Sequence, residues 1–307
     1  MNMRRRLAPL PRLAVAALLL AGAAAVRPAP AAAQQDTVPL EVSDSTMEIR
    51  LADGSTVYGR IVSTQGGRVV IQTAAGARIE VDRAQIRSMR PVQGTVRDGE
   101  VWYDDPHRTR LFLGPTGRSL RAGEGFFGVY EVFFPVVSYG IAEGFTLTGG
   151  LPVIPGALGE VAYIEPKLSV HVAPQLDVAV GASVLFGTGA EGSAGLVYGA
   201  ATYGVQDHAL HVMAGLPFFS DDSDDDFGDE GPLVMIGGET RVSRRIKLLT
   251  ENYVIPGESG AIVSGGARIF GERLSADAGL AFFLGEECDG QCFFPVVNFA
   301  YTFGRKR

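Results

Sequence analysis

The stretch Leu274-Ser-Ala-Asp-Ala-Gly-Leu-Ala-Phe-Phe-Leu284 alternates apolar residues with small or polar ones over eleven positions. Successive side chains of a β-strand point to opposite faces, so Leu274 and Leu280 share one face while Asp277 lies on the other. A strand of this length exceeds the roughly five or six residues common in soluble domains and matches the roughly 9–11 residues of a membrane-crossing strand. We therefore predict that Leu280 faces lipid and Asp277 faces the lumen of a barrel.

Two further stretches repeat the pattern. Residues 176–186 place Val180 on an apolar face and Asp177 on the opposite face. Residues 163–172 alternate in the same way, with Glu165 and Lys167 on the polar face. Long alternating strands without an amphipathic helix favour a closed transmembrane barrel over a soluble β-core.

The connections between these strands alternate in length, which permits a strand count. Short turns fall near 142–144, 173–175, 206–208, 243–245 and 271–273, and longer connections near 151–159, 187–192, 219–231, 256–260 and 285–292. Five short turns join ten strands, and a last strand at 296–303 makes eleven. If both ends of the barrel lie on the same side, one more strand is needed, for which 108–113 is the candidate. We predict an all-β chain whose residues 108–307 form an antiparallel transmembrane barrel of about 12 strands.

The N-terminus predicts export. Three arginines at positions 4–6 precede the apolar run 13–26, and Ala31 and Ala33 complete a small-x-small cleavage pattern, so residues 1–33 are predicted to be a signal peptide. Residues 34–45 are predicted to be a flexible leader. No later stretch approaches the length of a spanning helix, so the mature chain is expected to be either soluble or a barrel.

The charge balance bears on partners. The chain carries a net charge of −7, and removal of five arginines with the signal peptide leaves −12. An acidic chain without clustered Lys and Arg argues against nucleic acid as a partner. The pattern indicates no cofactor.

Residues 46–92 differ from the rest, because they form five short alternating runs joined by tight turns such as Asp53-Gly54. The phrase Leu51-Ala-Asp-Gly-Ser-Thr-Val-Tyr-Gly-Arg-Ile61 resembles the opening hairpin of Sm-like and SH3-like small barrels. That resemblance implies a small five-stranded barrel, for which we expect a structural role or a periplasmic protein partner. Residues 93–107 are predicted to be a linker.

The last strand carries aromatic and apolar residues on one face, namely Val297, Phe299, Tyr301 and Phe303. It resembles the aromatic-terminated last strand of outer-membrane barrels, although Gly304-Arg-Lys-Arg follows the final Phe. This resemblance implies the barrel assembly machinery as a partner during biogenesis, and outer-membrane lipid around the barrel. Residues 110–117, 123–127 and 138–147 resemble uncharacterised bacterial outer-membrane barrel proteins, which implies a location in the outer membrane, with residues 46–92 in the periplasm.

The polar faces of the strands yield a set of charged residues predicted to face the lumen. These are Glu131, Glu165, Lys167, Asp177, Glu239, Arg241, Lys247, Glu251, Arg268 and Asp277. They could line a charged conduit, or they could form an ion-pair network that fills the bore, since barrels near eight strands are packed and those of sixteen or more are open. The sequence leaves both interpretations open.

Other candidate sites are weaker. Cys288 and Cys292 lie in Cys-Asp-Gly-Gln-Cys, which predicts a disulfide loop in an oxidising compartment and has too few ligands for a metal site. The acidic loop 221–230 invites a calcium hypothesis, but its spacing does not fit an EF-hand and favours a solvated loop. Ser169 and His171 share a strand face, yet no nucleophile motif accompanies them, so no catalytic residue is assigned.

These patterns predict a non-enzymatic outer-membrane barrel protein that acts in envelope structure, passive transport or surface interaction. One alternative is a soluble secreted or periplasmic β-rich binding protein. A second is a barrel hydrolase that acts on lipid or peptide.

Overall fold

The computed structural model describes residues 43–153, 161–187, 192–221, 225–227, 231–254, 256, 260–285 and 292–304. The predicted signal peptide 1–33 and residues 34–42 of the predicted leader lie outside the described residues. Within the described ranges, no helix has the length and apolar character that crossing a membrane requires.

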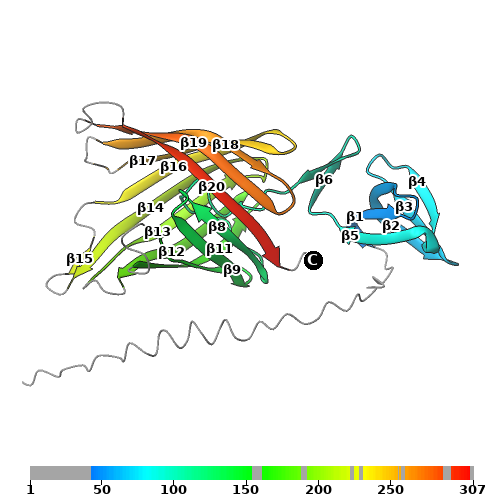
Figure 1. Ribbon diagram of the computed structural model, residues 1–307, viewed down its shortest axis with the longest axis horizontal. Coiled ribbons are helices and arrows are strands. Elements are labelled where there is room, and N and C mark those ends of the chain that lie inside the picture. The colour runs from blue at the N-terminus through cyan, green and yellow to red at the C-terminus, as the bar shows by residue number, and fades with distance from the viewer. Residues whose placement is uncertain are drawn as a thin grey trace, which may run out of the picture. The chain divides into compact units, whose positions relative to one another are not determined.

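Twelve antiparallel strands form a closed barrel, as the strand count predicted (Figure 1). The ring closes because β20 pairs with β8 and β13 pairs with β14. The short β15 (Asp225–Phe227) extends β14 outside the ring. The twelve strands are β8 (Glu124–Tyr130), β9 (Phe134–Ala142), β10 (Phe145–Gly150), β11 (Val161–Ala173), β12 (Leu176–Gly187), β13 (Gly192–Gly204), β14 (His208–Asp221), β16 (Leu233–Ser243), β17 (Ile246–Val254), β18 (Ala261–Phe270), β19 (Leu274–Leu284) and β20 (Phe293–Gly304).

The first barrel strand differs from the prediction. It is β8, beginning at Glu124, whereas residues 108–113 form no strand and lie inside the ring. The physical reason is that Arg108 and Arg110 form ion pairs with Glu124 and Glu165 inside the barrel. As part of a lipid-facing strand, these two arginines would lack such partners. The count of twelve was therefore correct while the candidate for the first strand was wrong.

The barrel has two different mouths. All five predicted short turns are present and lie at one end, which we call the turn mouth, and the longer connections lie at the other end, the loop mouth. Glu124 at the start of β8 pairs with Gly304 at the end of β20, so both ends of the barrel sequence lie at the turn mouth.

The outer face of the barrel is apolar. Val180 is 61% exposed and Leu280 is 43% exposed, whereas Asp277 is 3% exposed, in agreement with the predicted register. Other exposed apolar residues come from strands around the ring, including Val137, Ile141, Leu168, Val170, Leu210, Val212, Ile236, Leu248, Ile269, Leu274 and Phe299. A closed barrel with an apolar exterior and buried charges has the pattern that a lipid bilayer requires.

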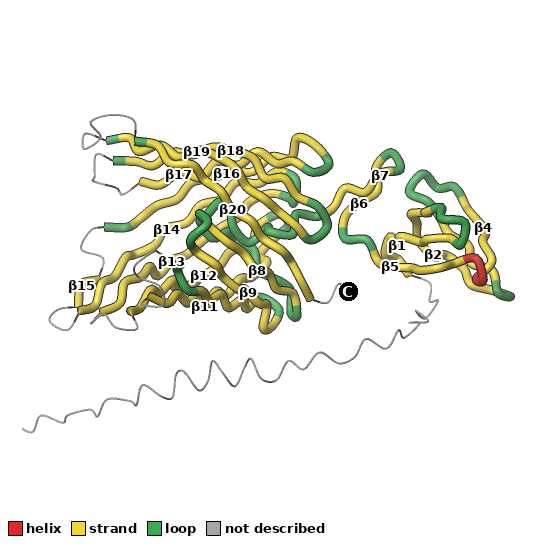
Figure 2. Tube along the Cα trace, in the orientation of Figure 1, coloured by secondary structure: helices red, strands yellow, loops and turns green. Residues whose placement is uncertain are grey.

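A separate five-stranded sheet precedes the barrel, in the order β4-β3-β2-β1-β5 (Figure 2). Its strands are β1 (Ser43–Leu51), β2 (Thr56–Gln65), β3 (Arg68–Gln72), β4 (Arg78–Asp82) and β5 (Ile86–Pro91), with the 3-10 turn η1 (Arg83–Gln85) before β5. Ile49, Ile61 and Ile71 are buried at its centre. The five strands lie where the sequence placed them, but β4 and β5 stand at opposite edges, and the described residues form no ladder that closes the sheet into an Sm-like or SH3-like barrel.

The predicted linker 93–107 contains structure. β6 (Gly94–Arg97) and β7 (Glu100–Tyr103) form a hairpin whose two turn residues, Asp98 and Gly99, have φ values of 52° and 77°. Two consecutive positive φ values are typical of the tight turn that matches strand twist, and Asp-Gly is a preferred pair for it.

Candidate functional site: the barrel interior

Residues 104–123, between the hairpin and β8, form a loop inside the barrel that we call the plug. The Thr116 amide donates to the Thr109 carbonyl at 3.0 Å and the Leu111 amide donates to the Gly114 carbonyl at 3.0 Å, so the chain reverses at 111–114. Partners of the plug come from strands around the ring, namely Thr146, Lys167, Thr202, Glu239, Glu251, Arg268, Asn298 and Thr302. A segment that contacts so many sides of a closed ring must lie within it.

The tip of the plug is held by one carboxylate. Glu251, on β17, accepts hydrogen bonds from the backbone amides of Phe112 at 2.8 Å, Leu113 at 3.1 Å and Gly114 at 3.1 Å. The Tyr253 hydroxyl donates to the same carboxylate at 2.7 Å. Three backbone amides that converge on one carboxyl group fix the backbone of the tip.

Arg268, on β18, joins the plug to the barrel wall. Its guanidinium donates to the carbonyls of His107 at 2.9 Å and Leu111 at 2.6 Å, and it forms ion pairs with Asp105 at 3.1 Å and Asp277 at 2.7 Å. The side chains of Arg268 and Asp105 have no exposed area, and that of Asp277 is 1% exposed. A buried charge is tolerated only when it is paired and hydrogen-bonded, and Arg268 satisfies both conditions.

A second charged chain crosses the lumen beside the first. Lys247 contacts Asp105 at 3.1 Å and Glu239 at 2.8 Å, and Glu239 also pairs with Arg118 of the plug at 2.7 Å. Acids and bases therefore alternate from wall to plug, so each charge is neutralised by a neighbour.

A third contact lies on β11. Arg110 of the plug pairs with Glu165, whose other oxygen accepts from the Tyr198 hydroxyl at 2.5 Å. Lys167, two residues further along the strand, donates to the Thr109 carbonyl at 3.1 Å. Charged wall residues thus bind both the side chains and the backbone of the plug.

Packing around the plug is tight. Leu111, Phe112 and Leu120 are at most 1% exposed and fill the space between the charged chains. Gly117 approaches the wall so closely that an added Cβ would lie 2.3 Å from the Asp177 carbonyl oxygen. The lumen is therefore filled at the level of the plug.

The residues that the sequence assigned to the lumen fall into two groups. Those on the plug contacts or beside them are 0–6% exposed, namely Glu165, Lys167, Glu239, Lys247, Glu251, Arg268 and Asp277. The other three lie nearer the ends of the barrel: Asp177 pairs with His171 at 2.8 Å and lies 3.6 Å from Arg118 of the plug, Arg241 pairs with Asp207 at 3.0 Å, and Glu131 lies in the turn between β8 and β9.

Arg241 also supports the entry of the plug. Its guanidinium lies 4.9 Å from the ring centre of Trp102 and donates to the Tyr103 carbonyl at 2.9 Å. Burial raises the pKa of Asp207, but hydrogen bonds from Arg241 and Arg97 outweigh this effect and hold the pKa below its ordinary value. The hairpin that leads into the plug is thus bound to a short turn of the barrel.

Sequence reasoning missed the plug side of the network, which consists of Asp105, Arg108, Arg110 and Arg118. One signal was available: the predicted lumen set holds six acids against four bases. The plug carries four arginines and two aspartates, so it supplies the missing positive charge. An unbalanced set of buried charges requires a partner segment.

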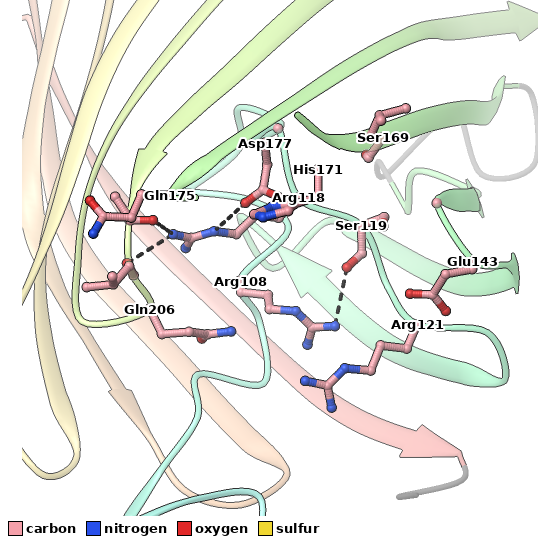
Figure 3. Close-up of a pocket in the computed structure, with 15 residues that line it drawn as sticks. Arg108, Arg118, Ser119, Arg121, Glu143, Ser169, His171, Gln175, Asp177 and Gln206 are labelled. Carbon is pink, nitrogen blue, oxygen red and sulfur yellow. Dashed lines mark hydrogen bonds and ion pairs between the residues drawn. The ribbon is translucent and has the colours of Figure 1, made fainter. Parts of the chain in front are cut away.

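An open cavity of about 520 Å³ lies at the turn mouth (Figure 3). Arg108, Arg118 and Arg121 of the plug line it, with His171 and Asp177 from the wall. Arg108 forms an ion pair with Glu124 at 2.7 Å, and Arg118 lies 3.6 Å from Asp177. The plug therefore forms one wall of this cavity.

Ser169 and His171, considered for catalysis, both line this cavity. The Ser169 hydroxyl is buried without a hydrogen-bond partner, and the His171 imidazole is bound to Asp177. A serine nucleophile needs a base within hydrogen-bond reach, and here none is in place. The geometry does not support hydrolysis by this pair.

The remaining candidates lie largely outside the described residues. Cys292 is disulfide-bonded, and Cys288 falls in the undescribed range 286–291. In the acidic loop 221–230 the structure describes only the backbone of Asp221 and of β15. Among the described residues, no group of three or more His, Cys, Asp or Glu side chains could hold a metal ion.

The closed ring, the apolar exterior and the charged interior define the class: the chain is a transmembrane β-barrel protein of the outer-membrane type. No family model and no curated protein matches the sequence. Among solved structures, the barrel is similar to the KdgM porin in complex with disordered oligogalacturonate (10% identity, 59% of this chain and 98% of that chain, TM-score 0.44). It is also similar to the NanC porin (9%, 61% and 100%, TM-score 0.39) and to a loop-deletion mutant of OmpT, an outer membrane protein of Vibrio cholerae (14%, 84% and 96%, TM-score 0.36).

Proposed function

We propose that this protein is an outer-membrane channel for small molecules whose lumen is closed by the plug and opens when the plug moves. The observation that carries the proposal is the plug itself, a loop held inside a closed ring by hydrogen bonds and ion pairs. The predicted signal peptide supports export, and residues 46–92 are assigned to the periplasmic side, where they could meet a protein partner.

The contacts of the plug suit a movable element. Many of them are hydrogen bonds and ion pairs, which water can replace at modest net cost. Both ends of the plug lie at the turn mouth: Tyr103 contacts Arg241 near the end of β16, and the Gly123 amide donates to the Gly140 carbonyl near the end of β9. The loop can therefore leave through the mouth by which it enters.

The wall residues predict the selectivity of the open channel. The plug carries a net positive charge, because its four arginines exceed its two aspartates. The wall left behind includes more carboxylates than bases, with Glu165, Glu239 and Glu251 among them. A lumen lined by excess negative charge attracts cations, so the open channel is expected to favour cations.

The test is ion conductance across a planar bilayer. Wild-type protein is expected to give rare or small currents, whereas a variant with residues 110–118 replaced by nine Gly and Ser residues is expected to give large, persistent, cation-selective currents. The matched control replaces residues 222–230, also nine residues, and is expected to conduct like the wild type. A plug variant that folds, judged by faster gel migration before boiling, but does not conduct would contradict a channel function.

The location has its own test. After membrane fractionation, the protein is expected in the detergent-extracted outer-membrane fraction, with a band that migrates faster unheated than boiled. Recovery in the soluble periplasmic fraction without a heat shift would favour the alternative of a soluble β-rich binding protein.

A further inference from the structure

A second cavity lies on the other side of the plug, toward the loop mouth. It has a volume of about 260 Å³. Most of its lining is apolar, with Leu113 at the plug tip and Phe134, Val136, Leu151 and Leu185 on the wall. It is thus a mostly apolar pocket whose floor is the tip of the plug, and Arg110 of the plug also lines it.

Two of the strands beside this pocket are short in the part of the chain that the structure describes. β8 has 7 residues and β10 has 6, whereas β20 has 12. The ladder between β20 and β8 ends at Asn298 and Tyr130, so Phe293–Val297 of β20 continue past the end of β8. Five residues of a strand correspond to roughly 16 Å. Among the described residues, β20 therefore continues beyond the end of β8 on the side of the barrel where the pocket lies.

One polar group in the pocket has no partner. The Oε1 atom of Glu131 is buried and forms no hydrogen bond with any described residue, and Glu131 lines the pocket. Its position is fixed from the backbone, because the Glu131 amide donates to the Val297 carbonyl at 3.0 Å. Buried acceptors are normally satisfied, and one that is not calls for a donor from outside the described chain.

We propose that this pocket binds a small, mostly apolar molecule that carries one hydroxyl or amine, with its apolar body on Leu113 and its donor on Glu131. A cavity of about 150 Å³ lined by apolar side chains holds benzene, so a cavity of this larger size suits a two-ring body. The proposal rests on the proposed channel function and names the class of molecule that the channel would admit. Because the ligand lies directly on the plug tip, its presence bears on the position of the plug.

The test is calorimetric titration of 1-naphthol into the full-length protein in lipid nanodiscs, with empty nanodiscs subtracted. The matched ligand is 1-methoxynaphthalene, which keeps the rings and lacks the donor. The wild type is expected to bind one 1-naphthol per protein, about tenfold more tightly than 1-methoxynaphthalene, which is the ratio expected for one additional hydrogen bond.

Three variants assign the binding to this pocket. Glu131→Leu is expected to remove the preference between the two ligands, whereas Glu143→Leu, in an exposed turn at the opposite mouth, is expected to retain it. Leu113→Trp is expected to fill the pocket and weaken 1-naphthol binding at least tenfold. If Leu113→Trp loses its heat-modifiable band, Leu151→Trp fills the same pocket from the wall.

The proposal is overturned if the wild type shows no saturable binding of 1-naphthol. It is also overturned if a folded pocket-filling variant binds 1-naphthol as tightly as the wild type. The two proposals fail separately. If the plug-replacement variant conducts but the wild type does not bind 1-naphthol, the channel function is supported and this class of ligand is excluded. If the wild type binds 1-naphthol but the folded plug-replacement variant does not conduct, the binding site is supported and the channel function is contradicted.

Discussion

The five-stranded sheet and the barrel are both antiparallel β-structures, yet their interiors are opposite in chemistry. The sheet buries Ile49, Ile61 and Ile71 and exposes most of its polar residues, although Glu48 is buried. The barrel exposes its aliphatic residues and buries Lys247, Arg268 and their carboxylate partners. The comparison teaches that the period-two pattern specifies strands in both regions. The surroundings decide which face is apolar: the inner face where the outside is water, and the outer face where the outside is lipid. A charged interior then needs a second set of charges, which the plug supplies.

The largest effect is expected where the barrel interior loses one charge. Arg268→Ala leaves Asp105 and Asp277 buried without their main partner, and breaking a buried pair in this way costs about 3–5 kcal/mol. The folded band on unboiled gels is expected to disappear at a clearly lower temperature, with conductance events becoming frequent. Arg245→Ala, at an exposed turn residue, serves as the control. Equal thermal stability of the two variants would mean that the charged network does not support the barrel.

A core truncation in the sheet tests whether the two regions depend on each other. Ile49→Ala removes most of a fully buried side chain, which costs about 2–5 kcal/mol. Proteolysis is expected to cleave residues 43–92 faster, while the heat-modifiable barrel band and the conductance stay unchanged. A barrel that loses its heat shift in this variant would show that the sheet is part of one cooperative unit with the barrel.

A charged residue introduced on the outer face of the barrel tests whether that face contacts lipid, unlike the exposed face of the sheet. Val180→Arg places a cation on the apolar exterior, at a cost of about 2–4 kcal/mol if the site lies near the bilayer midplane. Folding yield into lipid vesicles is expected to fall relative to Val180→Leu. In the sheet, Arg60→Leu changes an exposed polar position in the opposite sense and is expected to leave stability nearly unchanged. Equal yields for the two Val180 variants would remove this face from contact with lipid.

The smallest effect concerns the hairpin between the two regions. Because the folded pKa of Asp207 lies below its ordinary value, its contribution to stability is present above the ordinary range, about pH 4, and is lost as the pH falls through the folded pKa. The side chain is partly exposed, so the contribution stays below about 1 kcal/mol. Trp102, the only tryptophan, lies against Arg97 and Arg241 and reports the change by fluorescence. Asp207→Asn is expected to show the acid spectrum at neutral pH, and an unshifted spectrum would contradict this assignment.

The fold was predictable where a local pattern carries it. The alternation at 274–284 and 176–186 predicted strand positions and faces, and the five short turns predicted ten of the twelve strands. Each of these signals is contained in about ten neighbouring residues. Residues 46–92 were equally readable as five strands.

The plug was not predictable in the same way, because its conformation has no period. Arg110 and Leu111 lie where they do because Glu165 and Arg268, more than fifty and more than one hundred and fifty residues away, bind them. The run 108–113 also contains Leu111-Phe112-Leu113, which resembles a strand when read alone. Only the excess of acids among the predicted lumen residues pointed to a missing basic segment.

Because the plug enters and leaves through the same mouth, it is not threaded through the ring. No chain end has to pass through the barrel for the loop to go in or come out, so the ring can close first and receive the loop afterwards. The reverse order is equally open, with the loop serving as a core on which the strands gather. A segment that ran from one mouth to the other would have forced the ring to form around it and would have held it there permanently.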